Sequence, residues 1–131
     1  MKNTLKSVWI GVRILFAVFM VFAGMQHMLK PEFYIPFVPS FLPFITAIIY
    51  VSGIIEILLG LMLFFPKYVK IGAMVIMLLM LMFLPIHVWD VFSDTPAIGS
   101  NQAALIRLPI QFIFIGIAWK IKNIGSSQPE N

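Results

Sequence analysis

The chain has 131 residues, of which 61% are hydrophobic and 11% are charged, and its formal net charge is +4. A soluble domain is roughly 25% charged, so this composition excludes an ordinary soluble domain. The length indicates one domain, and the absence of cysteine excludes thiolate catalysis, disulfide exchange and cysteine-held metal clusters within the chain. No metal site is expected. The positive charge is interpreted as a signal of membrane topology and not of nucleic-acid binding.

Long apolar blocks predict membrane-spanning helices at about residues 8–28, 44–65, 69–89 and 103–121. Each block is close to the ~20 residues that cross a bilayer as a helix. The link at 66–70 is only a tight turn, so the second and third spans are expected to form an antiparallel hairpin. The predicted fold is all-α: a polytopic integral membrane protein with an antiparallel four-transmembrane-helix bundle in a single membrane domain, 1–131. Residues 122–131 are expected to form a polar, disordered tail.

Residues 30–43, between the first and second spans, combine helix-breaking and membrane-seeking residues. The prolines are Pro31, Pro36, Pro39 and Pro43, and the aromatic residues are Phe33, Tyr34, Phe37 and Phe41. Proline interrupts a helix, and aromatic side chains favour the headgroup level of a bilayer. We therefore expect an irregular interfacial segment that folds over one mouth of the bundle as a partial lid.

Lysines are distributed unevenly between the two ends of the expected bundle. The end with both termini carries Lys2, Lys6, Lys67, Lys70, Lys120 and Lys122, whereas the loops at the other end carry Lys30, Glu32, Asp90 and Asp94. Positively charged residues favour the cytoplasmic side of a membrane. Both termini are therefore predicted to be cytoplasmic.

Charged residues inside the spans are the candidate functional groups, because charge in the bilayer core is costly. A rise of ~1.5 Å per residue places Arg13 about 7–8 Å and Glu56 about 13–14 Å from the cytoplasmic boundary. This proximity predicts a structural ion pair between Arg13 and Glu56. A proton-carrying or ligand-binding role for Glu56 is the alternative.

Other polar side chains lie nearer the outer surface on the same depth scale. They are Gln111, Arg107, His87 and His27, and together with Glu56 they form the predicted ligand-binding set. Pro85 and Pro109 lie beside them, and each frees the backbone carbonyl four residues earlier. A polar cavity in the outer half is expected. The simpler alternative is that both histidines and Arg107 only anchor their helices at the membrane interface.

Several short motifs along the chain resemble those of the DoxX family of small bacterial four-span membrane proteins. They are Phe22-Ala-Gly-Met-Gln-His27, Val38-Pro-Ser-Phe-Leu-Pro43, Gly53-Ile-Ile-Glu56-Ile-Leu-Leu-Gly60, Leu84-Pro-Ile-His87 and Arg107-Leu-Pro-Ile-Gln111. Ile86 stands where many relatives have asparagine. The resemblance implies the bacterial cytoplasmic (inner) membrane and a link to quinone-dependent redox metabolism, with oxidoreductase subunits as partners.

The leading functional hypothesis is a non-catalytic or accessory membrane subunit that binds an amphiphilic ligand, either a quinone or a lipid. The chain has no recognisable redox centre, so electrons would come from a partner. Three alternatives stay open: a small proton or solute transporter or channel, a structural or assembly protein, and an enzyme that uses Glu56 as acid or base. A homo-oligomer is also compatible with the sequence.

Overall fold

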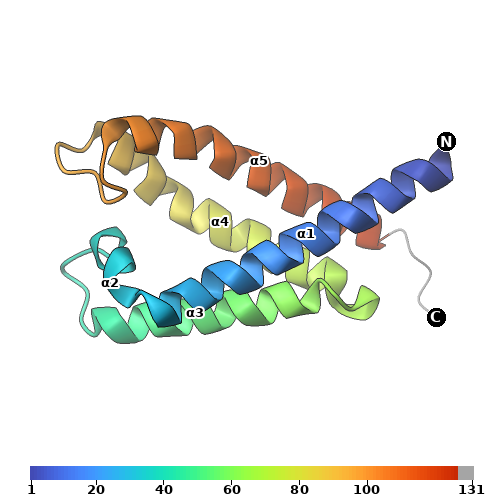
Figure 1. Cartoon of the computed structure of the whole chain (residues 1–131), viewed down its shortest axis with the longest axis horizontal. Helices are drawn as coiled ribbons and strands as arrows, with labels where there is room; N and C mark the ends of the chain where they lie inside the picture. Colours follow the sequence, from blue (N-terminus) through green and yellow to red (C-terminus); the bar gives the residue numbers. More distant parts are fainter. Residues whose placement is uncertain (127–131) are drawn as a thin grey trace.

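The computed structural model describes residues 1–126, and these residues form long helices joined by short segments (Figure 1). The elements in order are α1 (Lys2–Leu29), α2 (Pro31–Tyr34), the 3-10 turn η1 (Ile35–Phe37), α3 (Ile45–Met62), the 3-10 turn η2 (Pro66–Tyr68), α4 (Val69–Phe92) and α5 (Asn101–Ser126). Four helical stretches within residues 1–126 are long and apolar enough to cross a membrane. The predicted all-α, four-helix membrane bundle is confirmed.

Two helices extend past the predicted spans at the end of the bundle that holds the chain's N-terminus. α1 begins at Lys2, well before the apolar block at residue 8, and α5 continues to Ser126. Residues 122–126 are therefore helical and do not belong to a disordered tail, because no proline stops the helix there. Residues 127–131 lie outside the described part of the chain.

The helices associate as two antiparallel pairs, α1 with α3 and α4 with α5. Small residues bring α1 and α3 close: a Cβ on Gly24 would lie 2.5 Å from the backbone oxygen of Gly53, and one on Gly60 would lie 2.9 Å from that of Ala17. α3 and α4 are joined by η2 as an antiparallel hairpin, but each packs far more extensively against its other neighbour. Which helices pack together therefore depends on how well their surfaces fit, and not only on which helices are joined by a short loop.

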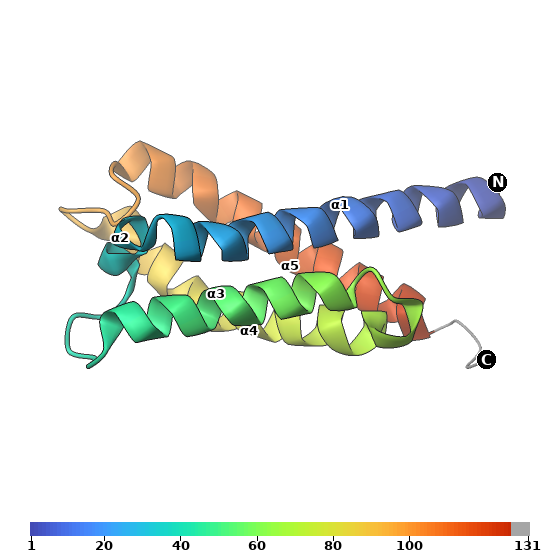
Figure 2. The same cartoon turned by 60° about the horizontal axis from the view of Figure 1, so that its bottom comes forward.

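The apolar core occupies only the half of the bundle near the chain's N-terminus. It is built from Phe16, Ala17, Met20, Leu59, Leu63, Val69, Ala73, Ile76, Met80, Ala118 and Ile121. Towards the opposite end the two helix pairs move apart, as Figure 1 shows; Figure 2 gives the same bundle turned by 60°. The bundle is thus closed by packing at one end and wedge-shaped at the other.

The segment between α1 and α3 folds over the open end. As the prolines predict, it is not one continuous helix but the short pieces α2 and η1 followed by a bend. The ring of Phe33 lies 5.2 Å from that of Tyr34 and 5.9 Å from that of Phe37, measured between centroids. These contacts hold the segment together as an aromatic lid, defined here as residues 31–38.

The close approach of α1 and α3 predicts that Gly53→Ala destabilises the protein. The new Cβ would lie 2.6 Å from His27 Cβ and 2.8 Å from the Gly24 carbonyl oxygen, so the helices must separate. We expect the free energy of unfolding to fall by about 1–3 kcal/mol, as for other overpacked sites. Thermal unfolding in detergent, followed by circular dichroism, measures the change.

Gly11→Ala is the matched control, because a Cβ on Gly11 would have no neighbouring atom within 4 Å. Alanine has the higher helix propensity, so this variant should be at least as stable as the parent. Equal melting temperatures for Gly53→Ala and Gly11→Ala would contradict the close packing of α1 on α3.

Candidate functional site

A cavity of about 410 Å³ lies between the two helix pairs, beneath the aromatic lid. All five residues of the predicted ligand-binding set line it: His27, Glu56, His87, Arg107 and Gln111. They come from α1, α3, α4 and α5 and are brought together only where the pairs diverge. Most of the remaining wall is apolar, with Phe, Ile, Leu and Met side chains, so the polar groups stand out as a small set in an otherwise hydrophobic chamber.

His27 and Glu56 form the polar part of the wall on the α1–α3 side. His27 Nδ1 lies 3.1 Å from the carbonyl oxygen of Ile49 and 3.0 Å from Ser52 Oγ. A carbonyl can only accept a hydrogen bond, so Nδ1 carries a proton. The other ring nitrogen, Nε2, faces Glu56 Oε1 at 3.7 Å.

A proton on either Nε2 or Glu56 would remove the repulsion between the imidazole lone pair and the carboxylate oxygen 3.7 Å away. If Nε2 carries it, the pair is imidazolium and carboxylate; if Glu56 carries it, the pair is imidazole and carboxylic acid. Both forms have no net charge, which suits an apolar wall because an isolated buried charge is strongly disfavoured. The His27–Glu56 pair can therefore hold a proton at the cavity surface.

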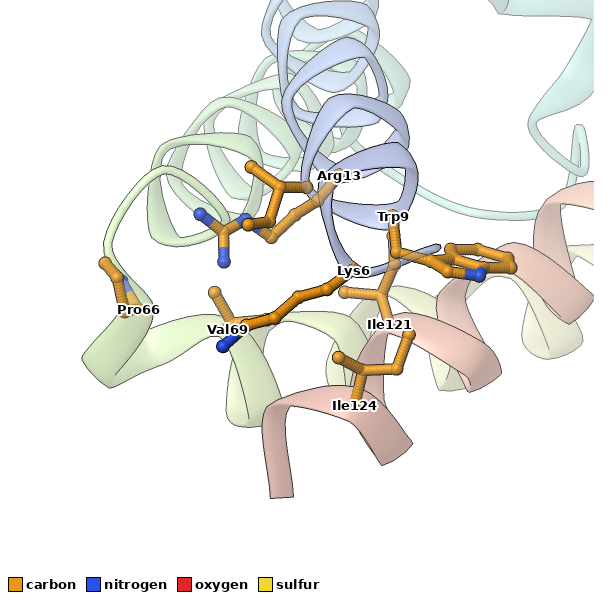
Figure 3. A pocket seen from close by; sticks show the side chains of 8 residues that line it. Lys6, Trp9, Arg13, Pro66, Val69, Ile121 and Ile124 are labelled. Carbon is orange, nitrogen blue, oxygen red and sulfur yellow. The ribbon is translucent and has the colours of Figure 1, made fainter. Parts of the chain in front are cut away.

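The structure corrects the predicted ion pair between Arg13 and Glu56. Within residues 1–126 Glu56 pairs with His27, whereas Arg13 lines a separate pocket with Pro66 and Val69 (Figure 3). Helix direction explains the difference. Cβ atoms tilt towards the N-terminus of their helix, so in antiparallel helices Arg13 and Glu56 lean away from each other while His27 and Glu56 lean together.

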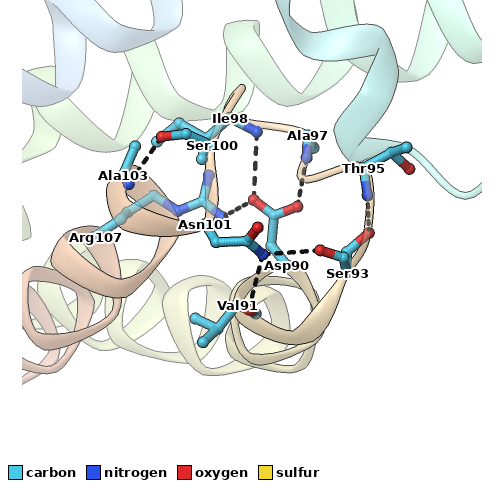
Figure 4. A network of polar contacts seen from close by, with 10 residues as sticks. All are labelled: Asp90, Val91, Ser93, Thr95, Ala97, Ile98, Ser100, Asn101, Ala103 and Arg107. Carbon is cyan, nitrogen blue, oxygen red and sulfur yellow. Dashed lines mark hydrogen bonds and ion pairs between the residues drawn. The ribbon is translucent and has the colours of Figure 1, made fainter.

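Asp90 and Arg107 form the polar anchor on the α4–α5 side (Figure 4). Arg107 Nη2 donates to Asp90 Oδ2 at 2.9 Å, and the same carboxylate accepts the backbone N–H groups of Ala97 and Ile98. The guanidinium also lies over the ring of Phe37, 4.8 Å from its centroid. Arg107 thus joins α5 to the end of α4, to the α4–α5 loop and to the lid.

The α4–α5 loop has its own hydrogen bonds next to this anchor. Asn101 Nδ2 donates to the carbonyl oxygens of Val91 and Ser93, at 3.1 and 2.8 Å. Ser100 Oγ accepts the backbone N–H of Ala103 at 3.1 Å, at the start of α5. The loop is therefore an ordered cap that holds Asp90 and Arg107 in position.

Gln111 and His87 line the cavity in different ways. Gln111 is buried and its Nε2 donates to the carbonyl oxygen of Met80 at 3.0 Å, which ties α5 to α4. The carbonyl group that Pro85 leaves without a helical partner is the next one along the chain, that of Leu81. His87 is half-buried, and its Nδ1 has no hydrogen-bond partner in the structure. Within the described residues, His87 therefore has a ring nitrogen that is free to bind a ligand in the cavity.

The lid places an aromatic hydroxyl residue against the His27–Glu56 pair. The Tyr34 ring lies 3.9 Å from the imidazole of His27, between centroids. Burial, assisted by the negative charge of Glu56, raises the pKa of the Tyr34 phenol above its usual value. At neutral pH Tyr34 therefore keeps its proton and presents an O–H donor at the cavity.

Asp90, Tyr34, Phe37 and Ser52 are site residues that the sequence did not identify as such. A signal for Asp90 existed, because Asp90 lies in the last turn of α4 and Arg107 lies in the second turn of α5. Antiparallel helices joined by a short loop place such residues at the same end of the bundle. The contacts of Tyr34 and Phe37 depend on how the lid folds, and no short-range pattern encodes them.

The buried contact between Asp90 and Arg107 predicts that Asp90→Ala is strongly destabilising. The Asp90 and Arg107 side chains are only 5% and 17% exposed, so the substitution leaves a largely buried cation without its partner. We expect a loss of about 3 kcal/mol, the scale for breaking a buried ion pair. Chemical or thermal unfolding in detergent measures it.

Asp94→Ala controls for the loss of a carboxylate from the same loop, because Asp94 is exposed. Its effect should be small. The double variant Asp90→Ala, Arg107→Ala should lose less than the sum of its two single variants, since the uncompensated charge is removed. Additive losses would show that the two side chains are energetically independent.

The position of Tyr34 predicts that its phenol loses its proton at a higher pH than an exposed tyrosine does. The difference in phenolate absorbance between the parent protein and Tyr34→Phe should have its midpoint above the usual 10.0, because burial and Glu56 both favour the neutral phenol. Glu56→Gln removes the charge and should lower that midpoint. A midpoint unaffected by Glu56→Gln would contradict the proximity of the two groups.

Comparison with known proteins supports one assignment. No curated protein matches the chain, and no solved structure matches it. Residues 16–122 match the family described as a domain of unknown function (DUF8561). The matched region begins within α1, ends within α5 and includes every residue that lines the cavity. The chain therefore belongs to the DUF8561 family.

Proposed function

We propose that this protein is a non-catalytic membrane subunit that binds an amphiphilic ligand in the cavity between its helix pairs, and that the ligand is a quinone. The observation that carries the proposal is the convergence of His27, Glu56, His87, Arg107 and Gln111 on one apolar chamber. Ligand sites typically have volumes of about 300–1,000 Å³ and a mostly apolar wall with a few converging polar groups. The cavity fits this description.

The two polar walls suit a flat ring with oxygen atoms on its edge. Arg107 is held by Asp90 and offers further N–H groups, and a quinone oxygen accepts hydrogen bonds from such donors. The His27–Glu56 pair on the opposite wall would hold one of the two protons that a quinone takes up when two electrons from a partner reduce it to a quinol. The isoprenoid tail of a quinone would pack among the apolar side chains between the helix pairs.

The DoxX resemblance supports the same proposal, because it implies proximity to quinone-linked oxidoreductases. In this proposal a partner subunit supplies the electrons, and this chain positions the quinone and its proton. The same resemblance implies the bacterial inner membrane, and the distribution of lysines supports an orientation with both termini in the cytoplasm. The cavity then lies in the half of the membrane that faces away from the cytoplasm.

A proton or solute channel is less well supported by the geometry. Such a path would need to connect the cavity with the end of the bundle that holds Arg13. That region is filled by the apolar core, in which Ala17, Ala73 and Ile76 have no exposed surface. A binding chamber that is closed at one end fits these contacts better than a continuous path.

Ala23→Trp tests the proposal because it fills the cavity without removing a polar group. Ala23 lines the cavity, whereas the neighbouring Phe22 does not and is 58% exposed on the outside of the bundle. Decylubiquinone binding to the detergent-solubilised protein, measured by native mass spectrometry, should be lost in Ala23→Trp and retained in the matched control Phe22→Trp. Equal binding by both variants would contradict the proposal.

The polar groups are tested separately with substitutions of similar size. Glu56→Gln and His27→Gln should each weaken decylubiquinone binding by about tenfold, the scale of one charge-assisted hydrogen bond. Circular dichroism checks that the helices are intact. If Ala23→Trp instead displaces a co-purified phospholipid while decylubiquinone never binds, the cavity is a lipid site and the quinone assignment is wrong.

A further inference from the structure

A second, smaller cavity lies at the other end of the bundle, among α1, α4, α5 and the η2 turn (Figure 3). Its volume is about 30 Å³, and its lining includes Lys6, Trp9, Arg13, Pro66, Val69 and Ile121. A space of this size holds about two water-sized groups, such as two oxygens of a larger ligand. The apolar core separates it from the chamber between the helix pairs, so the two sites are independent.

Lys6 and Arg13 make this pocket strongly positive. They are seven residues apart on α1, so they share one face of the helix, and both side chains extend towards Pro66 and Val69 (Figure 3). Arg13 Nε is buried and has no hydrogen-bond partner among residues 1–126. A buried donor without a partner is uncommon and indicates an additional ligand or water at the site.

The described carboxylates do not neutralise these cations. Glu56 and Asp90 are paired at the opposite half of the bundle, and Glu32 and Asp94 lie in the segments at that same far end. The remaining acidic side chain, Glu130, lies outside the described residues. Within residues 1–126, the positive charge of the pocket is thus left for a bound anion.

The surroundings of the pocket match a phosphate group at a membrane surface. Lys120 Nζ lies 5.9 Å from the centroid of the Trp9 ring, which brings a third cation to the same side of the bundle. Tryptophan favours the headgroup level, and basic pockets between transmembrane helices bind anionic headgroups. Ile10 and Ile124 also line the pocket and provide apolar surface for acyl chains.

We propose that the Lys6–Arg13 pocket binds a phosphate group, carried either by an anionic phospholipid headgroup or by free phosphate. Arg13 holds the phosphate oxygens through its N–H groups, and Lys6 neutralises the charge from the rim. This site is separate from the proposed quinone cavity. It binds its ligand whether or not the larger cavity is occupied.

Native mass spectrometry of the full chain in detergent tests the proposal with phosphatidylglycerol, phosphatidylcholine and inorganic phosphate as separate probes. The double variant Lys6→Gln, Arg13→Gln should bind phosphatidylglycerol about 30-fold more weakly, because each basic residue near an anionic lipid changes binding about fivefold. The control Lys2→Gln, Lys67→Gln removes the same charge from exposed positions that do not line the pocket, where solvent and salt screen the interaction with the phosphate, so binding should stay within about twofold of the parent.

The probes distinguish the two sources of phosphate. Selective loss of phosphatidylglycerol binding, with weak phosphatidylcholine binding throughout, supports a lipid headgroup site. Binding of inorganic phosphate that is lost only in the Lys6→Gln, Arg13→Gln variant supports a free-phosphate site. Equal loss in both double variants, or no loss in either, with helicity intact by circular dichroism, overturns the proposal.

Discussion

The packing of one half of the bundle determines the shape of the other half. Gly24, Gly53 and Gly60 allow α1 and α3 to touch backbone to backbone, and the apolar core joins this pair to α4 and α5 near the η2 turn. Because the core ends near Met20 and Met80, the helix pairs diverge beyond it. The cavity exists because close packing between the two helix pairs is confined to one end, and the five residues of the predicted ligand-binding set all lie at the other.

Two clusters of polar residues, one on each wall of the cavity, stabilise this open half. On one wall His27 is fixed by Ile49 and Ser52 and faces Glu56; on the other, Asp90 holds Arg107 against the loop. Arg107 is paired with the opposite charge of Asp90, and the His27–Glu56 pair has no net charge in either of its protonated forms, so neither wall places an isolated charge in an apolar region. The lid touches both walls, Tyr34 against His27 and Phe37 against Arg107. Movement of the lid would therefore change the contacts of both His27 and Arg107.

The two cavities give the bundle opposite chemical character at its two ends. The chamber under the lid contains paired charges and is mostly apolar, which suits an amphiphile held within the membrane. The Lys6–Arg13 pocket contains cations without described counter-ions, which suits an anion at the membrane surface. Because the apolar core lies between them, either site can be altered by substitution without direct contact with the other.

Hydrophobic block length, proline positions and the depth of each polar residue along its helix were sufficient to predict the four helices, the irregular lid and the convergence of His27, Glu56, His87, Arg107 and Gln111 on one cavity. These features depend on each segment's own residues and on the rise of a helix. The partners of Glu56 and Arg13 could not be predicted from depth and helix length alone. Depth alone favoured Arg13 for Glu56, but side-chain direction in antiparallel helices turned Glu56 to His27 and Arg13 to a second pocket. The pairing of α1 with α3, the closed core and the wedge between the pairs were likewise decided by tertiary packing, because they depend on which helix surfaces fit together.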